Sequence, residues 1–111
     1  MRIDVGGLGF DRDAVAVVTG AANGIGRATS LMLAAAGVAV AAWDLDGDSL
    51  RGVAREIRSL GSECHPYVAD LTDAGAIDDG WRSVAALGKP VRYLVSNAGP
   101  PASTPMDVGH V

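Results

Sequence analysis

The sequence predicts an α/β fold in which four parallel strands alternate with three helices that cover both faces of one sheet. Three observations lead to this prediction. The 111 residues are 49% hydrophobic and 20% charged, which is typical of a globular domain. Four short apolar runs alternate along the chain with stretches of helix-forming residues, and the connections are short. Glycine, with 15 residues, is about twice as frequent as the average share of about 7%, and part of this excess follows the apolar runs.

The first predicted element is a strand at residues 14–18. These five residues are all apolar and precede Thr19 and Gly20, as in a strand that is buried on both faces of a parallel sheet. The preceding residues 1–13 are polar and rich in glycine, and we expect them to form a lead-in without regular structure.

A helix and a second buried strand are expected next. Residues 24–36 are rich in helix formers, and Gly37 follows at the place where helices favour glycine. Residues 38–43 form the second apolar run, which ends at Asp44. The three elements predict a strand–helix–strand unit with a right-handed crossover.

The clearest helical periodicity follows this second strand. One set of apolar residues recurs at spacings of three and four, which predicts a single apolar stripe. Its members are Leu50, Val53, Ala54, Ile57 and Leu60. The charged residues of the opposite face are Arg51, Arg55, Glu56 and Arg58. We expect the helix to begin near Gly47 and to end at Gly61.

The remaining elements have weaker signals. Residues 64–71 are less hydrophobic than the first two strands, which favours a third strand near an edge of the sheet. Residues 73–87 predict a helix whose two internal glycines lower its propensity. Residues 91–95 predict a fourth strand, and residues 100–111, with three prolines, predict an irregular tail.

Composition also excludes several classes of protein. The net charge is -4 and the pI is about 4.8, so a nucleic-acid binder with a basic patch is not expected. No apolar run reaches the roughly 18 residues of a membrane-spanning helix, and the chain start lacks the apolar core of a secretory signal. A single cysteine cannot form an internal disulfide, which favours a reducing, cytoplasmic location.

Three glycines join the first strand to the first helix. Gly20 permits a sharp turn, Gly24 has no side chain to obstruct a phosphate, and Gly26 lets the helix lie close to the sheet. Free amides at the start of the helix would then face an anion. A tight turn that requires small residues is the alternative, but the position between strand and helix favours dinucleotide binding.

Asp44 lies 24 positions after Gly20, close to the offset of about 20 that is expected for an acidic residue on an adenosine ribose. A carboxylate there accepts hydrogen bonds from both ribose hydroxyls and repels a 2′-phosphate. No lysine or arginine lies at 21–25 or 45–50 to neutralise such a phosphate. The prediction is NAD(H) as cofactor. In the alternative, Asp44 caps the following helix, a role that Asp46 or Asp48 could also fill.

Together these motifs resemble those of the short-chain dehydrogenase/reductase family. The segment 19–26, TGAANGIG, is similar to the cofactor motif T-G-x-x-x-G-x-G. The pair 70–71 resembles the Asp-Leu that borders adenine, and the stretch 96–99 resembles N-N-A-G, with Ser96 in place of the first asparagine. The resemblance covers 14–99 and implies the N-terminal part of a Rossmann-type sheet, with strand order 3-2-1-4 and incomplete at its C-terminal side.

The resemblance also implies a role for each matching residue. The residues along the pyrophosphate and its ribose would be Gly20, Asn23, Gly24, Ile25 and Gly26. Those at the adenosine ribose would be Asp44 and Leu45, and those beside adenine would be Asp70 and Leu71. Asn97, Ala98 and Gly99 would lie along the cofactor toward the nicotinamide. For Asp70 a turn or a helix cap is the alternative, and Thr72 and Asp73 compete for it.

The family's catalytic residues have no counterpart in these 111 residues. Members use a Tyr-x-x-x-Lys pair with an upstream serine to move a proton as hydride passes to or from the nicotinamide. Here Tyr67 precedes Leu71 by four positions, Tyr93 precedes Asn97, and the only lysine is Lys89. We therefore assign no catalytic residue and predict that the chain alone does not turn over. The complete enzyme would be a homo-oligomer by resemblance, and its alcohol or carbonyl substrate stays undetermined.

Two other functions are retained as alternatives. One is a non-catalytic module that senses dinucleotides or mediates interactions, which would gain support if the gene ended after residue 111. The other is a methyltransferase, which Thr19 at the strand end and the N-A-G segment argue against. No metal site is predicted, because Cys64, His65 and His110 lack ligand spacing.

Three further expectations concern packing and solvation. Trp43 and Trp81 are expected to be packing residues rather than stacking platforms, because nothing basic surrounds them. Arg27 is expected to face solvent, with a phosphate contact as the alternative. The fourth strand would be unpaired along one side, so the isolated chain is expected to be poorly soluble or marginally stable.

Overall fold

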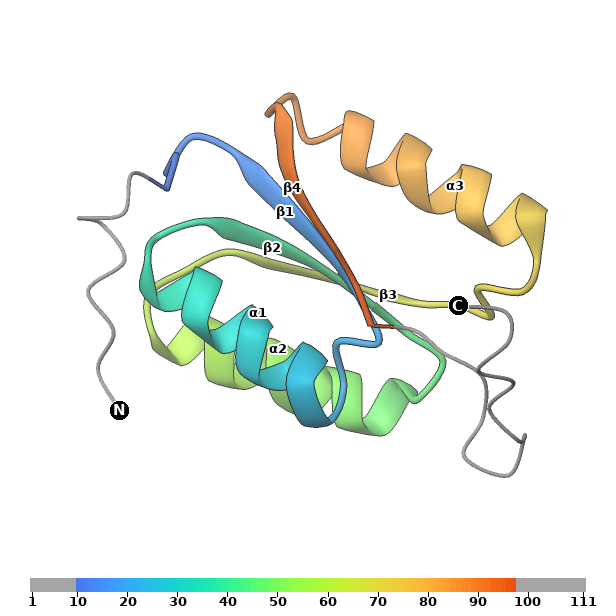
Figure 1. Cartoon of the computed structure of the whole chain (residues 1–111), viewed down its shortest axis with the longest axis horizontal. Coiled ribbons are helices and arrows are strands. Elements are labelled where there is room, and N and C mark those ends of the chain that lie inside the picture. The colour runs from blue at the N-terminus through green and yellow to red at the C-terminus, as the bar shows by residue number, and fades with distance from the viewer. Residues whose placement is uncertain (1–9, 98–111) are drawn as a thin grey trace, which may run out of the picture.

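The computed structural model describes residues 10–97, in which a parallel sheet lies between two layers of helices (Figure 1). The elements in chain order are β1 (Val15–Thr19), α1 (Gly24–Ala35), β2 (Ala39–Asp44), α2 (Gly47–Ser59), β3 (Cys64–Val68), α3 (Ala74–Ala85) and β4 (Val91–Ser96). Helices α1 and α2 cover one face of the sheet and α3 covers the other. The strand order β3-β2-β1-β4, all parallel, confirms the predicted fold class and order. The expected tail at 100–111 and the first nine residues of the expected lead-in lie outside the described residues.

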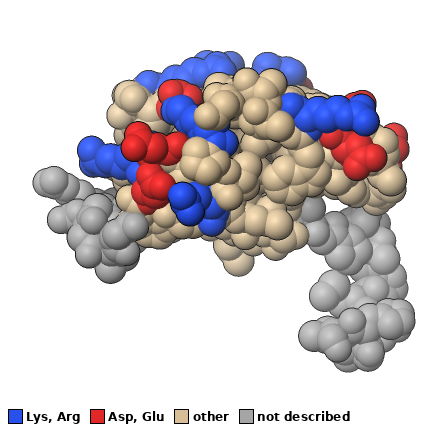
Figure 2. Space-filling model, turned by 90° about the horizontal axis from the view of Figure 1, so that it is seen from above, with Lys and Arg blue, Asp and Glu red and all other residues tan. Residues whose placement is uncertain are grey.

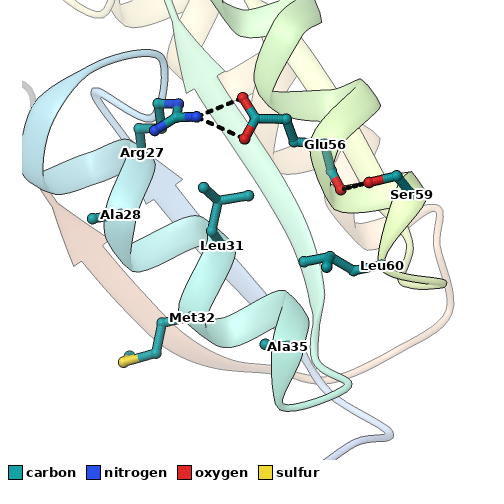
Figure 3. A pocket seen from close by; sticks show the side chains of 8 residues that line it. All are labelled: Arg27, Ala28, Leu31, Met32, Ala35, Glu56, Ser59 and Leu60. Atoms are coloured by element: carbon teal, nitrogen blue, oxygen red, sulfur yellow. Dashed lines mark hydrogen bonds and ion pairs between the residues drawn. The ribbon is translucent and has the colours of Figure 1, made fainter. Parts of the chain in front are cut away.

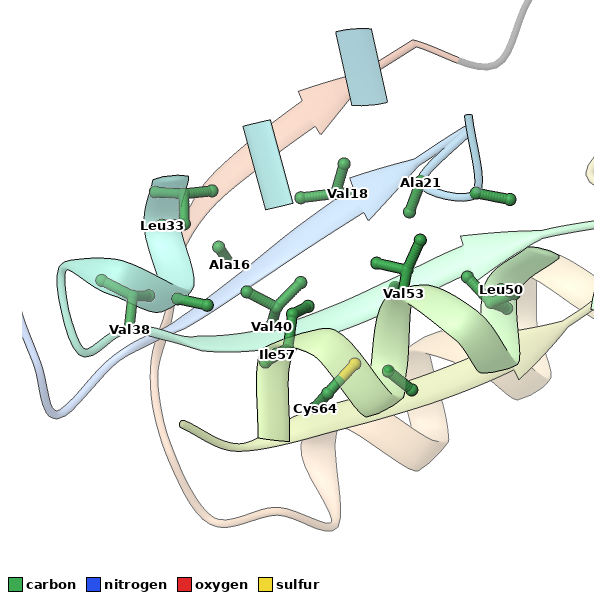
Figure 4. Packing of buried hydrophobic residues seen from close by; sticks show 14 of the residues in the cluster. Ala16, Val18, Ala21, Leu33, Val38, Val40, Leu50, Val53, Ile57 and Cys64 are labelled. Atoms are coloured by element: carbon green, nitrogen blue, oxygen red, sulfur yellow. The ribbon is translucent and has the colours of Figure 1, made fainter. Parts of the chain in front are cut away.

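Alternate residues of β1 enter two different cores. Ala16 and Val18 join the larger core beneath α1 and α2 (Figure 4). Val15 and Val17 join a smaller core with Trp43 beneath α3. These four residues of β1 are 0% exposed, because helices cover both faces of this central strand. This explains why the strand is a continuous apolar run rather than an alternating one.

The apolar stripe of α2 is confirmed except at its last member. Four of its residues are at most 2% exposed, and they are Leu50, Val53, Ala54 and Ile57. The prediction for Leu60 is wrong, since this residue is 54% exposed. The helix ends at Ser59, so Leu60 is its C-cap and its side chain lies in the groove toward α1 (Figure 3).

Strand β3 lies at a sheet edge as predicted, but it is shorter than the predicted strand at residues 64–71. Its pairing with β2 ends at Asp44 opposite Val68, followed by one more bond from the Ala69 amide to the Asp44 carbonyl at 3.0 Å. Beyond this point β2 offers no further partner. The chain then turns, and the Asp70 carboxylate accepts the Thr72 amide at 2.9 Å.

Residues 10–13 contact the sheet more closely than a lead-in would. The rings of Phe10 and Tyr93 lie 5.3 Å apart between centroids. The Asp11 amide donates to the Tyr93 hydroxyl at 2.8 Å, and the Asp11 carboxylate pairs with Arg92 at 3.2 Å. These contacts attach the chain before β1 to the outer strand β4.

An aromatic cluster fills the space between β2, β3 and α3. Trp43 meets Trp81 edge-on at 5.1 Å and Tyr67 at 5.6 Å. Trp43, at 2% exposed, is confirmed as a packing residue, whereas Trp81 contacts it from α3 and is 36% exposed. A Cβ atom on Gly80 would lie 2.9 Å from the Trp43 and Tyr67 rings. The glycine that weakens the sequence signal for α3 is therefore the residue that lets this helix approach the sheet.

The described residues also show how charged side chains, apolar helices and metal-ligating side chains are distributed. Figure 2 shows acidic and basic side chains interspersed on one face of the molecule rather than gathered by sign. Among residues 10–97, no helix has the length and apolar character needed to cross a membrane. Within the same range, no three histidine, cysteine or acidic side chains are grouped in a way that could hold a metal ion.

Candidate dinucleotide-binding site

The described candidate residues gather at the edge of the sheet that is formed by the C-terminal ends of the strands. Parallel strands end at the same edge, and the register sets Thr19 of β1 opposite Trp43 of β2 and Ser96 of β4. Asp44 similarly lies opposite Val68 of β3. The segments that follow these ends carry the predicted residues from Gly20 to Gly26, Asp44 and Leu45, Asp70 and Leu71, and Asn97. Ala98 and Gly99 lie outside the described residues.

Local geometry explains why glycine is present at three positions of the turn between β1 and α1. Gly20 and Gly24 have φ values of 64° and 57°, which only glycine adopts readily. A Cβ atom on Gly24 would meet nothing within 4 Å, so this position opens on free space. A Cβ atom on Gly26 would lie 1.9 Å from the Gly20 carbonyl oxygen. Gly26 thus allows the helix start to contact the turn, and Gly24 leaves room beside it.

The start of α1 presents backbone donors. Among the described residues, no group accepts a hydrogen bond from the amides of residues 23–26. The N-cap residue Asn23 makes no side-chain cap, and its amide group instead reaches the Asp46 carboxylate at 3.5 Å. The first turn of the helix carries no acidic side chain. Unpaired amides and the positive end of the helix dipole suit an anion such as a phosphate.

Asp44 ends β2 beside this turn and does not cap α2. Its Oδ2 accepts the Ala22 amide at 2.9 Å, and its Oδ1 accepts the Asp46 amide at 3.0 Å. The cap of α2 is Asp46, whose side chain accepts the Ser49 amide at 3.2 Å. Hydrogen bonds from Ser49 lower the pKa of Asp46. The cap alternative for Asp44 is therefore wrong, and its carboxylate lies against the glycine turn.

The side chain of Arg27 pairs with Glu56 of α2 and not with a described candidate residue at the strand ends. Its guanidinium donates to both carboxylate oxygens of Glu56 at 2.6 Å, which raises the pKa of Arg27 (Figure 3). The pair lies at one end of a groove of about 450 Å³ between α1 and α2. The expectation that Arg27 lies on the outside of the first helix is confirmed, and the phosphate alternative has no support in this geometry.

The remaining candidate residues at the C-terminal ends of the strands are apolar or acidic. Ile25 and Leu45 are 76% and 67% exposed, which is unusual for large aliphatic residues and leaves them available to a ligand. The Asp70 carboxylate accepts the Thr72 hydroxyl at 2.7 Å and the Thr72 amide, and these bonds lower the pKa of Asp70. Asp70 therefore stabilises the turn after β3, and its contact with adenine stays a prediction. Leu71 packs partly against the smaller core.

The cap of α3 belongs to another residue. Asp73 accepts the Gly75 amide at 2.9 Å and is the N-cap of this helix. The helix-cap alternative for Asp70 is therefore wrong. Asp70 remains exposed at the same sheet edge as Asp44.

Thr19 connects the ends of β1 and β4. Its hydroxyl accepts the Asn97 amide at 3.1 Å and lies 3.4 Å from the Ser96 hydroxyl, to which it donates. Thr19 belongs to the predicted motif, but its contacts and those of Ala22 were not predicted. The small side chain of Ala22 is the one signal in the sequence that could have indicated close packing there, and this residue is 2% exposed.

The described tyrosines have structural partners. The Tyr67 hydroxyl donates to the Ala76 carbonyl at 2.8 Å, and the Tyr93 hydroxyl accepts the Asp11 amide. Lys89 pairs with Glu63 at 2.9 Å. This agrees with the absence of a Tyr-x-x-x-Lys pair from the sequence.

Comparison with known proteins relates this geometry to a family. The family model for short chain dehydrogenases matches residues 14–108. The 1-deoxy-11-beta-hydroxypentalenate dehydrogenase of Streptomyces avermitilis is 39% identical over 104 residues, which cover 86% of this chain and 38% of that protein.

Two solved structures share the fold. A metagenomic short-chain oxidoreductase in complex with NADP has a TM-score of 0.75 and 39% identity, over 79% of this chain and 40% of its own. NAD+-bound xylitol dehydrogenase has a TM-score of 0.74 and 37% identity, over 79% and 34%. The chain covers 38% of the Streptomyces avermitilis dehydrogenase and 15% of a probable oxidoreductase of Mycobacterium tuberculosis, to which it is 36% identical over 91 residues.

Proposed function

The chain belongs to the short-chain dehydrogenase family, and on that premise we propose that its strand ends form the NAD(H)-binding part of an oxidoreductase that interconverts an alcohol and a carbonyl. One observation carries the choice of cofactor. The Asp44 carboxylate lies against the glycine turn, with Oδ2 at 2.9 Å from the Ala22 amide. A negative charge at this place favours ribose hydroxyls over a 2′-phosphate.

The residues present fit a dinucleotide. The free amides at the start of α1 would receive the pyrophosphate over the open space at Gly24. Asp44 and Leu45 would hold the adenosine ribose, and Asp70 and Leu71 would lie beside adenine. Asn97, with Ala98 and Gly99, would continue toward the nicotinamide. Ile25 would cover part of the pyrophosphate and its ribose.

When bound, NAD supplies the hydride acceptor of the oxidation. The groups of this chain would bind and orient the cofactor, and we assign none of the residues at 10–97 to the transfer of the substrate proton. We propose that the 111 residues alone do not turn over and that a complete enzyme is cytoplasmic and homo-oligomeric. The second candidate is a non-catalytic module that binds dinucleotides through the same unpaired amides at the start of α1.

Calorimetric titration of the purified chain with NAD(H), NADP(H) and S-adenosylmethionine tests the proposal. We expect NAD(H) to bind most tightly. NADP(H) binding at least as tightly would refute the cofactor choice, and tighter S-adenosylmethionine binding would favour a methyltransferase. NAD-linked oxidation of an alcohol by the isolated chain would refute the prediction of no turnover.

A matched pair of glycine variants locates the site. Gly24→Ala places a methyl group where the pyrophosphate is proposed to lie. Gly61→Ala is the control, because it adds a methyl group after the end of α2, where no ligand is proposed. Both glycines have positive φ, at 57° and 82°, and neither Cβ would meet an atom within 4 Å. The cost in strain should therefore be similar. Only Gly24→Ala should lose NAD(H) affinity, and equal losses would place the site elsewhere.

A further inference from the structure

The Asp44 side chain joins segments that are far apart in the sequence. Its Oδ2 accepts the amide of Ala22 in the turn after β1, 22 positions away, at 2.9 Å. Its Oδ1 accepts the amide of Asp46 in the turn after β2 at 3.0 Å. The backbone carbonyl of the same residue accepts the Ala69 amide after β3 at 3.0 Å. One residue thus binds the chain that follows three different strands.

The bond to Ala22 comes where the backbone ladder stops. The Ala21 amide donates to the Trp43 carbonyl at 3.2 Å, which is the last backbone bond between the glycine turn and β2. The next amide, that of Ala22, has the Asp44 carboxylate as its acceptor. Ala22 is 2% exposed, so water cannot readily replace this acceptor. A buried amide without a partner costs about 1–3 kcal/mol, so loss of the carboxylate would favour another conformation of the turn.

We propose that Asp44 is a positioning residue for the glycine turn, in which its carboxylate holds the buried Ala22 so that the unpaired amides at the start of α1 stay available to an anion. The inference deepens the proposed function, because those amides are the proposed pyrophosphate site. The two roles of the side chain are compatible. A carboxylate has about four acceptor positions, and two stay available for ribose hydroxyls after Ala22 and Asp46 are bound.

The positioning role and selection by charge alone predict opposite changes in the NADP(H) affinity of Asp44→Ala. If Asp44 acts only on the ribose, Asp44→Ala should strengthen NADP(H) binding and leave binding of inorganic pyrophosphate unchanged. If Asp44 holds the turn, the same variant should weaken both, because the phosphate-binding amides lose their arrangement. Removal of Asp44 by itself would then not convert the site to NADP(H).

The test uses hydrogen exchange by NMR on the ligand-free chain and phosphorus NMR titration with inorganic pyrophosphate. The variants are Asp44→Ala and Asp44→Asn, of which the second keeps the shape but only one acceptor oxygen. Asp48→Asn is the control, since this side chain is 95% exposed and pairs only with Arg51. We expect at least a tenfold loss of protection at Ala22 and at least fivefold weaker pyrophosphate binding in Asp44→Ala. The changes should be smaller in Asp44→Asn, whose remaining oxygen can still accept the Ala22 amide.

The core amides decide between a local and a general effect. Protection of Val17 and Val40, both 0% exposed, should change less than that of Ala22. Asp48→Asn should alter neither readout. Unchanged protection of Ala22, or pyrophosphate and NADP(H) binding that is equal or tighter in Asp44→Ala, would overturn the proposal.

Two further features keep the test decisive. If Asp44→Ala does not fold, the native chain still answers, because Ala22 should exchange much more slowly than Asn23. Equal exchange of these two amides would refute the positioning role. The exchange measurement requires no cofactor, so failure of the chain to bind NAD(H) would refute the proposed function and leave this inference to be judged separately.

Discussion

The carbonyl oxygen of Gly20 lies 1.9 Å from the position that a Cβ atom on Gly26 would occupy. The nearest atoms to that position all belong to the backbone of Gly20 and Ala21, so a larger residue could not be accommodated by rotation of a side chain. The turn and the helix start therefore form one packed unit. Its shape requires glycine at position 26 before any question of ligand binding arises.

Gly26→Ala should consequently destabilise the fold, by about 2–3 kcal/mol as expected for a strained, overpacked site. Urea unfolding at equilibrium measures the change. The control is Gly52→Ala in α2, where the new Cβ atom would meet only the Arg55 guanidinium at 4.0 Å. That variant should be neutral or more stable, by up to about 1 kcal/mol, since alanine favours a helix. Equal effects of the two substitutions would refute the packing argument.

The elements that the sequence predicts best are those whose signal arises within one segment. The apolar runs at 14–18 and 38–43 predict the two inner strands, because helices cover both faces of the sheet there. The helix at 47–59 has a regular apolar stripe. The end of β3 could not be predicted, because it depends on where the neighbouring strand β2 stops at Asp44.

In the candidate site, too, some features could be predicted from one segment of the sequence and others could not. Spacing alone identified Gly20, Gly24, Gly26 and Asp44, because the motif reflects the geometry of a strand, a turn and a helix. Contacts between segments were not predictable from spacing. The bond from Ala22 to Asp44 depends on how the turn folds against β2.

Gly80→Ala sets helix propensity against packing. Alanine would favour α3 by up to about 1 kcal/mol, but its Cβ atom would lie 2.9 Å from the rings of Trp43 and Tyr67. Overpacking of this kind costs about 1–3 kcal/mol, so we expect net destabilisation. Thermal unfolding followed by near-ultraviolet circular dichroism reports both stability and the aromatic cluster. A more stable Gly80→Ala protein would show that α3 moves away at little cost.

Thr19→Val should loosen the connection between β1 and β4. Valine keeps the shape of threonine but removes the hydroxyl that accepts the Asn97 amide at 3.1 Å, while the Thr19 backbone carbonyl, which accepts the same amide at 3.2 Å, stays in place. We therefore expect a loss of at most about 1 kcal/mol in the free energy of unfolding and faster exchange of the Asn97 amide. Thr19→Ser retains the hydroxyl and should preserve protection of Asn97. If valine and serine behave alike at Asn97, the hydroxyl is not the acceptor that matters.

Stability should depend on pH through Glu63. Hydrogen bonds from Lys89 at 2.9 Å and from His65 at 3.2 Å lower the pKa of this carboxyl below its ordinary value. Because the folded pKa is the lower one, the stabilisation is present above the unfolded pKa and is lost as the pH falls through the folded pKa. Glu63→Gln should therefore be less stable than the native chain near neutral pH and equal to it in acid.

The difference should be at most about 1 kcal/mol, since the side chains are partly exposed and solvent screens the pair. Urea unfolding at about pH 7 and about pH 3 measures it. Asp78→Asn is the control, because no ion pair of this residue is found within the described part of the chain. A difference for Glu63→Gln that persists in acid would show that the effect is not electrostatic.

The outer edge of β4 should promote self-association. Within residues 10–97 this strand pairs only with β1, and Leu94 and Val91 are 59% and 41% exposed. Leu94 lies opposite Val17 and so faces the side of the sheet that carries the smaller core. An unpaired strand with exposed apolar side chains is a template for another chain. The native chain should therefore associate as its concentration rises in sedimentation velocity, and Leu94→Lys should reduce this association.

The control is Leu45→Lys, which introduces the same charge at a residue that is 67% exposed but lies outside the strand edge. This variant should associate like the native chain. A native chain that stays monomeric at high concentration, or equal effects of the two lysines, would show that the β4 edge is not the contact.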